Sequence, residues 1–209
     1  ATSEGNAFLY LGSISGLRTA PSLILDNPGN QAGGQFGSSV ASAGDSNGDG
    51  YDDVIVGAQG QGLTSGEGAA FLYDGSPAGL RGTPGSTLEN PTHQANGLFG
   101  CSVAPAGDVN GDGYADLVVG AFGQNSESGE PAAGSAFAYH GAALEVSGSP
   151  SVALANPTGQ RISFFGISVA WRLSGHRGAS RTLMAVQPRL LMTLRPSGST
   201  ATPRQRRPT

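Results

Sequence analysis

The chain has 209 residues, of which 35 are Gly and 13 are Pro, while 37% are hydrophobic and only 12% are charged. So many glycines exclude a fold built from long helices, because each would cost about 1 kcal/mol in a helix interior. The low charge and ample hydrophobic content exclude a polyelectrolyte coil. A turn-rich β protein with short strands is therefore expected.

The formal net charge of −4 is an average over two unlike segments. Residues 1–160 carry two Arg and all fifteen acidic residues, a net charge of −13, whereas residues 161–209 carry nine Arg and no acid. The acidic segment favours bound cations, and disfavours nucleic acid, as its partner. The single cysteine, Cys101, excludes an internal disulfide framework and a Cys-rich zinc site. No apolar run approaches 18 residues, so no transmembrane segment is predicted.

A repeat of 63 to 66 residues organises the chain. The dipeptide Asn27-Pro28 recurs at Asn90 and Asn156, and Phe36-Gly37 recurs at Phe99 and Phe165. The chain begins inside a copy, so we expect it to be a piece of a larger protein whose remaining repeats are missing. In chain order the predicted units are 1–26, the last strands of a preceding unit; 27–89 and 90–155, two whole units; 156–170, the start of another; and 171–209, an Arg-rich tail outside the repeat.

Within each unit the pattern predicts four strands. The expected ranges are 38–43, 53–57, 69–73 and 86–88 in the first whole unit, and 101–106, 116–120, 135–139 and 151–154 in the second. The N-terminal copy adds a weak run at 23–25. Four strands in every unit, separated by Gly-rich turns, are typical of a β-propeller blade. The fold predicted is all-β, an incomplete propeller of two whole and two partial four-stranded antiparallel blades; a solenoid is the alternative.

Two equivalent loops carry the chemistry, because each places oxygen-bearing side chains at alternating positions before a strand. Ca²⁺ takes six to eight oxygen ligands in forgiving geometry, and glycine at the sixth position permits the tight curl that brings them together. The seventh position would contribute its backbone carbonyl. Two Ca²⁺ sites are therefore predicted, with ligands Asp45, Asn47, Asp49, Tyr51 and Asp53 in the first and Asp108, Asn110, Asp112, Tyr114 and Asp116 in the second.

Other interpretations of these loops are weaker. An EF-hand would need Glu at the twelfth position, where Val56 and Val119 stand. Magnesium demands tighter octahedral geometry, and zinc would require His or Cys. The plain structural alternative is a pair of polar turns, which Asp, Asn and Gly also favour.

The repeats resemble FG-GAP repeats, the units of the seven-bladed propeller of integrin α-subunits and of many bacterial surface proteins. Phe36-Gly37 and Phe99-Gly100 match the first half of the motif, and Gly57-Ala58 and Gly120-Ala121 match the second half without its proline. The resemblance covers about residues 1–170 and places the family's calcium loop on both predicted loops. It implies an extracellular or cell-surface binding scaffold.

The repeat breaks after Ser168-Val169-Ala170, where a third acidic loop is expected and Trp171-Arg172 follows instead. Three interpretations of residues 171–209 remain open: translation out of frame, a genuine basic tail, or a divergent last blade or short helix around 183–194. The three His residues share no spacing, and no pattern typical of a catalytic site occurs. The function predicted is a non-catalytic adhesion scaffold that recognises a protein or carbohydrate through its loops; the alternative is the propeller module of a larger secreted hydrolase.

Overall fold

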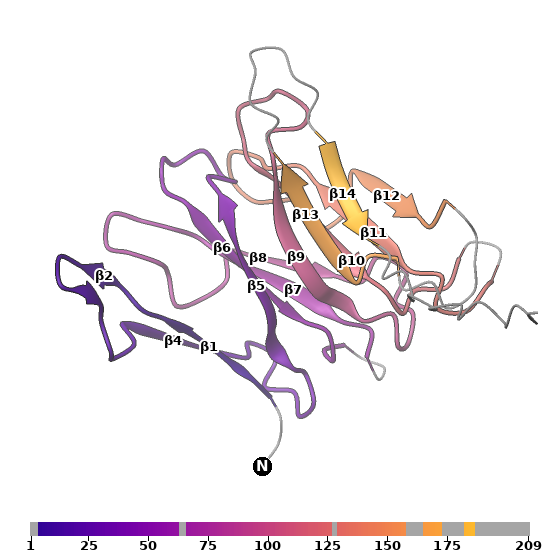
Figure 1. Ribbon diagram of the computed structural model, residues 1–209, viewed down its shortest axis with the longest axis horizontal. Helices are drawn as coiled ribbons and strands as arrows, with labels where there is room; N and C mark the ends of the chain where they lie inside the picture. Colours follow the sequence, from indigo (N-terminus) through magenta and orange to yellow (C-terminus); the bar gives the residue numbers. More distant parts are fainter. Residues whose placement is uncertain (1–3, 63–65, 127–128, 158–164, 173–181, 187–209) are drawn as a thin grey trace, which may run out of the picture.

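The computed structural model describes residues 4–62, 66–126, 129–157, 165–172 and 182–186, and the regular elements there are all β-strands (Figure 1). Two four-stranded antiparallel sheets form the centre, each with its strands in sequence order. The prediction of an all-β chain with four-stranded antiparallel blades is thus confirmed. Within the described ranges no helix is long and apolar enough to cross a membrane. The strands of the two blades are β5 (Phe36–Gly44), β6 (Asp53–Ala58), β7 (Ala69–Tyr73) and β8 (Ser86–Glu89), then β9 (Phe99–Gly107), β10 (Asp116–Ala121), β11 (Ser135–Tyr139) and β12 (Val152–Ala155).

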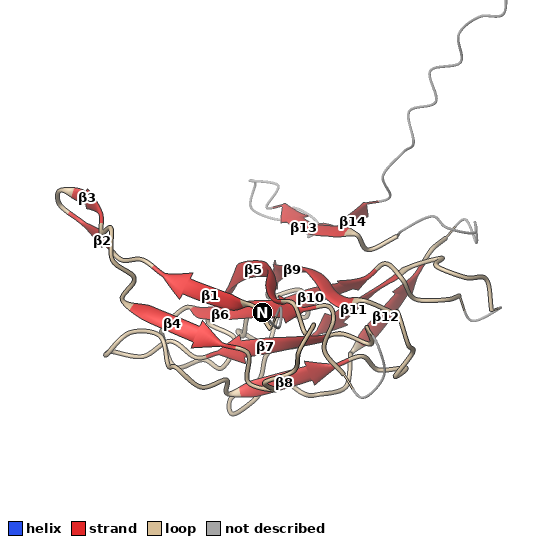
Figure 2. Cartoon of the chain, turned by 90° about the horizontal axis from the view of Figure 1, so that it is seen from below, coloured by secondary structure: helices blue, strands red, loops and turns tan. Residues whose placement is uncertain are grey.

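Smaller sheets flank the two blades. β1 (Asn6–Leu9) pairs with β4 (Leu23–Asp26), and between them β2 (Gly12–Ser13) and β3 (Gly16–Leu17) form a hairpin that projects away from the blades (Figures 1 and 2). At the other end β13 (Ser168–Arg172) pairs with β14 (Thr182–Val186). Residues 182–186 therefore form a strand, as in the divergent-blade interpretation and unlike a helix beginning at 183. Residues 173–181 and 187–209 lie outside the described residues.

The first strand of each blade is longer than its sequence pattern predicts, and a bulge is the reason. Phe36 pairs with Ala58, but the register then shifts before Ser39 pairs with Gly57. Gly37, between the paired positions, has φ +84°, which extends the strand past the point where simple alternation stops. The second blade repeats the bulge: Gly100, the equivalent of Gly37, has φ +81°.

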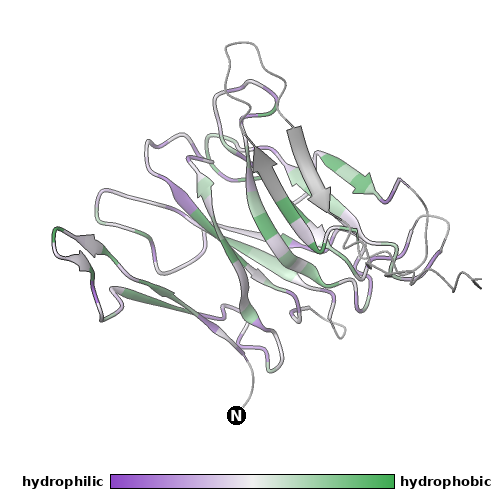
Figure 3. Cartoon of the chain, viewed as in Figure 1, coloured by the Kyte–Doolittle hydropathy of each residue, from purple (hydrophilic) through white to green (hydrophobic). Residues whose placement is uncertain are grey.

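The core lies between the sheets, so the middle strands bury both faces. Val56 and Phe71 pack in a cluster with Leu25 of the preceding sheet. Their neighbours Ile55 and Leu72 face the other way and pack in a cluster with Leu117 and Tyr139 of the following blade. Figure 3 shows hydrophobic residues along the strands of both blades and of the β1–β4 sheet. Burial on both faces explains why the sequences of these strands are continuous apolar runs and do not alternate with polar residues.

The same aromatic packing recurs in both blades. The ring centroids of Phe36 lie 5.8 Å from Phe71 and 6.3 Å from Tyr73; the rings of Phe99, Phe137 and Tyr139 repeat both distances. Such tilted and edge-on pairs contribute about 0.5–1.5 kcal/mol each beyond the area they bury. These rings are therefore blade core, as the spacing of the repeat predicts.

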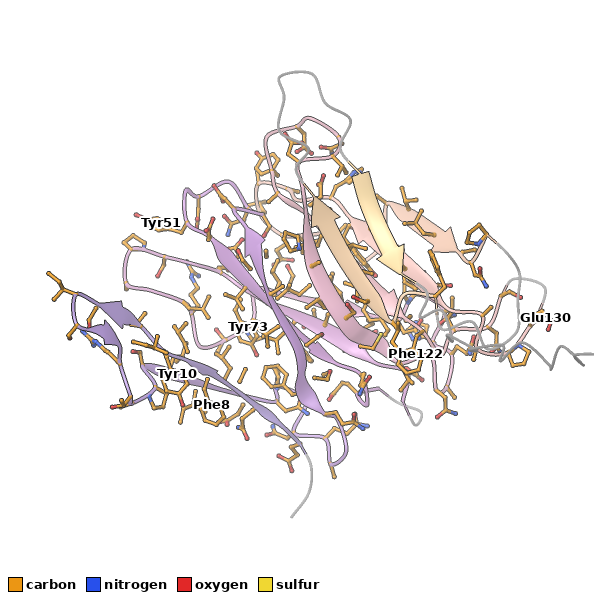
Figure 4. The ribbon with its side chains drawn as sticks, viewed as in Figure 1. Phe8, Tyr10, Tyr51, Tyr73, Phe122 and Glu130 are labelled. Atoms are coloured by element: carbon orange, nitrogen blue, oxygen red, sulfur yellow. The ribbon has the colours of Figure 1, made fainter. Side chains whose placement is uncertain are left out.

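The β1–β4 sheet lacks this coverage because it has only two strands. β7 pairs with neighbours on both edges, whereas β1 pairs only with β4. Phe8, which occupies the place of Phe71 in the repeat, is 54% exposed, and Tyr10 is 41% exposed. Figure 4 labels both on the β1 side of the molecule.

Successive sheets are joined where the Phe-Gly dipeptide begins the next blade. The N–H of Phe36 donates to the Glu4 carbonyl at 2.8 Å, and that of Phe99 donates to the Glu67 carbonyl at 3.0 Å. Parallel bridges link Gly68 to Phe99 and, one blade on, Gly134 to Phe165. The backbones approach so closely that a Cβ on Gly68 would lie 2.0 Å from the Phe99 oxygen. Each blade is thus fixed to the next by backbone contacts in which only glycine fits.

Candidate metal-binding loops and the opposite face

The two predicted loops link the first two strands of each blade. Residues 45–52 connect β5 to β6, and residues 108–115 connect β9 to β10. Asp53 and Asp116 are the first residues of the strands that follow. Because both blades run in the same order, the two loops occur at corresponding ends of their sheets. Tyr51 marks this end of the β5–β6 hairpin in Figure 4.

The first aspartate of each loop is the centre around which the backbone curls. The Asp45 carboxylate accepts hydrogen bonds from the N–H groups of Gly48 at 2.7 Å, Asp49 at 3.0 Å and Gly50 at 2.9 Å. Gly48 and Gly50 have φ values of +77° and +89°, which are accessible to glycine at little cost. These positive φ values explain why the curl requires glycine at both positions.

The second loop has the same curl. The Asp108 carboxylate accepts hydrogen bonds from the N–H groups of Gly111 at 2.6 Å and Gly113 at 3.2 Å. The φ values of these two glycines are +82° and +95°. Two loops with different residues at their second and eighth positions therefore share one backbone shape.

The third and fifth positions are oriented by the backbone two residues further on. The Asn47 side-chain oxygen accepts the Asp49 N–H at 2.9 Å, and the Asp49 carboxylate accepts the Tyr51 N–H at 3.0 Å. These are Asx turns, the local hydrogen bonds that Asp and Asn favour. They hold successive oxygen-bearing side chains within one short curl.

In the second loop, Asn110 and Asp112 repeat these turns and add a side-chain contact. The Asn110 amide donates to the Asp112 carboxylate at 2.7 Å, and the Tyr114 N–H donates to its other oxygen at 2.9 Å. The Tyr114 N–H, followed by the Asn110 amide, lowers the pKa of Asp112 because both hydrogen bonds favour the ionised form. The loop environment therefore favours a carboxylate at this position.

The ninth position differs from the rest of the loop. Asp53 is fully buried, and its carboxylate accepts hydrogen bonds from the Ser46 N–H at 3.1 Å, the Ser46 hydroxyl at 2.5 Å and the Gly75 N–H at 2.8 Å. Asp116, also fully buried, accepts the N–H groups of Val109 at 2.6 Å and Gly141 at 3.0 Å. Each carboxylate ties its loop to the turn after the third strand.

Sequence reasoning did not identify Ser46, Gly75 and Gly141 as partners of these carboxylates. A signal was available, because Gly75 and Gly141 both stand two residues after a tyrosine that recurs in the repeat, Tyr73 and Tyr139. The position indicates a shared turn, but only the fold shows that the turn reaches back to the start of the second strand.

The chemistry of each loop matches a hard cation. Each offers Asp carboxylates, an Asn amide oxygen and a backbone carbonyl, and neither offers the His or Cys that zinc favours. Among the residues that the structure describes, no group of three or more His, Cys, Asp or Glu side chains is placed to hold a metal. A cation would therefore depend on the Asn and carbonyl oxygens as well as on the exposed carboxylates.

A cavity lies at the end of the strands opposite the two loops. A cavity of about 420 Å³ lies among the turn after Asn27-Pro28, the connection from β6 to β7, and the turn that holds His93. His93 lies 3.9 Å from the largely buried Glu67 carboxylate. Since β6 runs from the loop at Asp53 toward this connection, the cavity and the loop lie at opposite ends of the strand. Figure 4 likewise labels Phe122 and Glu130, in the second blade, at the end opposite Tyr51.

Comparison with known proteins identifies the repeat. Residues 36–73 and 99–138 match the FG-GAP repeat family. The chain carries two FG-GAP repeats. They span β5 to β7 and β9 to most of β11, so each repeat supplies the first three strands of one blade and the loop that precedes its second strand.

The chain is also similar to integrin α-subunits. Integrin alpha-5 of Xenopus laevis is 38% identical over 121 residues, which cover 57% of this chain and 11% of that protein. Human integrin alpha-IIb is 42% identical over 106 residues, or 51% and 10%. Integrin alpha-PS5 of Drosophila melanogaster is 38% identical over 94 residues, or 43% and 9%. The chain therefore spans about a tenth of the length of the curated relatives it matches.

Proposed function

We propose that this chain is a calcium-stabilised segment of an FG-GAP propeller that acts as a non-catalytic binding or adhesion scaffold at the cell surface or outside the cell. The observation that carries the proposal is the recurrence of one oxygen-rich loop, with the same backbone hydrogen bonds, in two successive blades. The similarity to integrin α-subunits supports the adhesion role and the extracellular setting.

The proposed ligands of the first Ca²⁺ are Asp45, Asn47, Asp49, the Tyr51 carbonyl and Asp53, and those of the second are Asp108, Asn110, Asp112, the Tyr114 carbonyl and Asp116. The cation would neutralise the loop carboxylates, which otherwise repel one another at short range. Asp53 and Asp116 already use backbone N–H groups as partners, so they would contribute their remaining lone pairs. The metal's role is structural.

Recognition of a protein or carbohydrate is assigned to the loops at the end opposite the calcium loops. The cavity at that end is lined by amide, carboxylate and imidazole groups and by the apolar side chains of Ala69 and Phe71 in β7. A site of this mixed character can bind a partner through a few directed polar contacts over an apolar floor. In this proposal the loops at one end of the molecule bind the metal, and the loops at the opposite end bind the partner.

Thermal unfolding of loop variants in Ca²⁺ and in EDTA tests the metal assignment. Extracellular-type sites bind at roughly 10⁻⁴–10⁻³ M, so millimolar Ca²⁺ would add on the order of 1 kcal/mol per site. Asp45→Ala and Asp112→Ala each remove a ligand from one of the two proposed sites, so each is expected to lose the part of the Ca²⁺-dependent Tm increase that its own site contributes, and the double variant is expected to lose all of it. Asp52→Ala is the matched control, because this exposed carboxylate lies in the same loop but outside the proposed ligands. An undiminished Ca²⁺-dependent Tm increase in both single variants, or any such increase in the double variant, would refute the assignment.

A further inference from the structure

The two FG-GAP loops are in direct contact with each other across the blade boundary. The Ala115 N–H donates to the Asp45 carbonyl at 2.9 Å, and the Ala142 N–H donates to the Ser46 carbonyl at 3.0 Å. Both acceptors belong to the first two residues of one loop, and both donors belong to the following blade. One of these bonds fixes the first loop to the second loop, and the other fixes it to the turn after β11.

A side-chain contact reinforces this boundary. The Tyr114 ring lies against Gly48, so that a Cβ added at Gly48 would lie 2.5 Å from the ring. Gly44, the last residue of β5, has a similar lack of space, because a Cβ added there would lie 2.8 Å from the Ala115 Cβ. Tyr114 thus spans the boundary with its ring, while its backbone carbonyl is one of the proposed ligands of the second loop.

The hydrogen bonds form a continuous connection between the two buried carboxylates. The Asp53 carboxylate accepts the Ser46 N–H and hydroxyl, and the Ser46 carbonyl accepts the Ala142 N–H. The adjacent residue, Gly141, donates its N–H to the Asp116 carboxylate at 3.0 Å. Any change that fixes the first loop therefore also fixes backbone groups that shape the second.

We propose that the two calcium loops are energetically coupled, so that filling either one raises the affinity of the other. This inference rests on the proposed calcium function and adds to it a regulation of the paired sites. Binding at one loop orders the carbonyls of Asp45 and Ser46, which hold the Ala115 and Ala142 N–H groups in place. The second cation then meets a loop whose ordering cost is already met in part, which gives positive coupling without a large structural change. The effect is reciprocal by thermodynamic necessity.

Calorimetric Ca²⁺ titration of the full chain and of single-site variants measures the coupling. Asp49→Ala removes a ligand from the first loop and Asp112→Ala removes its equivalent from the second; neither side chain contacts the other blade in the hydrogen bonds above. The coupling factor is the product of the two single-site Kd values divided by the product of the two stepwise Kd values of the unaltered chain. We expect a factor of about 5, at the lower end of the range for coupled sites.

Substitutions of the two tyrosines test the route. Tyr114→Ala keeps the carbonyl but removes the ring from Gly48, and the factor measured in this background should fall to between about 1 and 2. Tyr51→Ala, at the same loop position, is the matched control and should leave the factor unchanged. Tyr114→Phe preserves the ring contact and should also leave it unchanged.

The outcomes separate the two proposals. If the unaltered chain binds no Ca²⁺, the proposed function and the coupling are both wrong. If both loops bind and the coupling factor is 1 or less, only the coupling is wrong and the calcium function stands. A factor above 1 that Tyr114→Ala does not reduce would contradict the assigned route through the ring.

Discussion

Gly68→Ala tests whether the close backbone approach between blades holds the fold together. Gly68 has φ +89° and its Cβ would lie 2.0 Å from the Phe99 oxygen, where the Phe99 N–H also donates to the Glu67 carbonyl at 3.0 Å. A matched control exists in the same blade: Gly79 has φ +108°, but a Cβ there meets nothing within 4 Å. Alanine is strained by the positive φ at both positions, but only at Gly68 does its Cβ clash with the Phe99 backbone.

The magnitude follows from separating those two costs. A non-glycine residue at such a φ costs about 1–3 kcal/mol, which applies to both variants. In Gly68→Ala the Phe99 backbone must also move, which loses a junction hydrogen bond of about 1 kcal/mol. It also loosens the packing of the fully buried Phe99 ring, at about 1–2 kcal/mol. The extra destabilisation of Gly68→Ala over Gly79→Ala is then about 2–3 kcal/mol.

Thermal unfolding followed by circular dichroism measures this difference. For a chain of 150–250 residues each kcal/mol lowers the Tm by about 2–4 °C, so Gly68→Ala is expected to melt about 4–12 °C below Gly79→Ala. Both melts are recorded in EDTA to remove any contribution from calcium. Equal Tm values for the two variants would show that the backbone strain accounts for the whole effect and that the junction contributes little.

Three further predictions concern buried polar groups. Asp53→Ala leaves two backbone N–H donors without their acceptor and is expected to destabilise the chain by about 2–5 kcal/mol in urea unfolding in EDTA, and by about 1 kcal/mol more in millimolar Ca²⁺, because a proposed ligand is also lost. Tyr139→Phe removes a fully buried hydroxyl that has no hydrogen-bond partner among the described residues, so stability should stay the same or rise by up to about 1 kcal/mol; a loss above that would indicate a bound water or other partner. Burial, followed by the charge of Asp26, raises the pKa of Tyr73 to about 12 from 10.0. The unfolded chain therefore loses this proton first, and stability measured against pH should fall between about pH 10 and 12; Tyr73→Phe should flatten that slope.

The repeat itself made most of the fold predictable. The spacing of Asn27, Asn90 and Asn156 marks each junction, and Asn90 indeed donates to the Glu67 carbonyl at 3.0 Å there. The third strands were predicted with their observed ends, because Phe71 and Tyr73 alternate clearly. The first strands were predicted too short, since the bulge at Phe36-Gly37 depends on a positive φ that alternation of residue types does not reveal. The β2–β3 hairpin was missed because two-residue strands have no periodicity to read.

In the candidate site, too, the local contacts could be predicted from the sequence, whereas the long-range contacts could not. The curl around Asp45 is formed by backbone groups at most five residues away, so the residue types and spacing of the loop are enough to predict it. The partner of Asp53 at Gly75 lies 22 residues away, and the donor to the Asp45 carbonyl lies in the next blade at Ala115. These contacts follow from how hairpins and blades stack, which the loop sequence alone does not encode.

The buried carboxylates also bear on how much the proposed cation would add to stability. A fully buried charge is costly unless hydrogen bonds satisfy it, and Asp53 is satisfied by three donors from its own blade. The loop therefore takes its shape from the protein before any cation arrives, and only the exposed carboxylates, such as Asp49, still need a counter-charge. A cation that neutralises exposed groups contributes about 1 kcal/mol at millimolar concentration, far less than one that must organise the whole loop. The proposed coupling concerns the carbonyls of Asp45 and Ser46, which accept the N–H groups of Ala115 and Ala142 and therefore lie where the first loop meets the next blade.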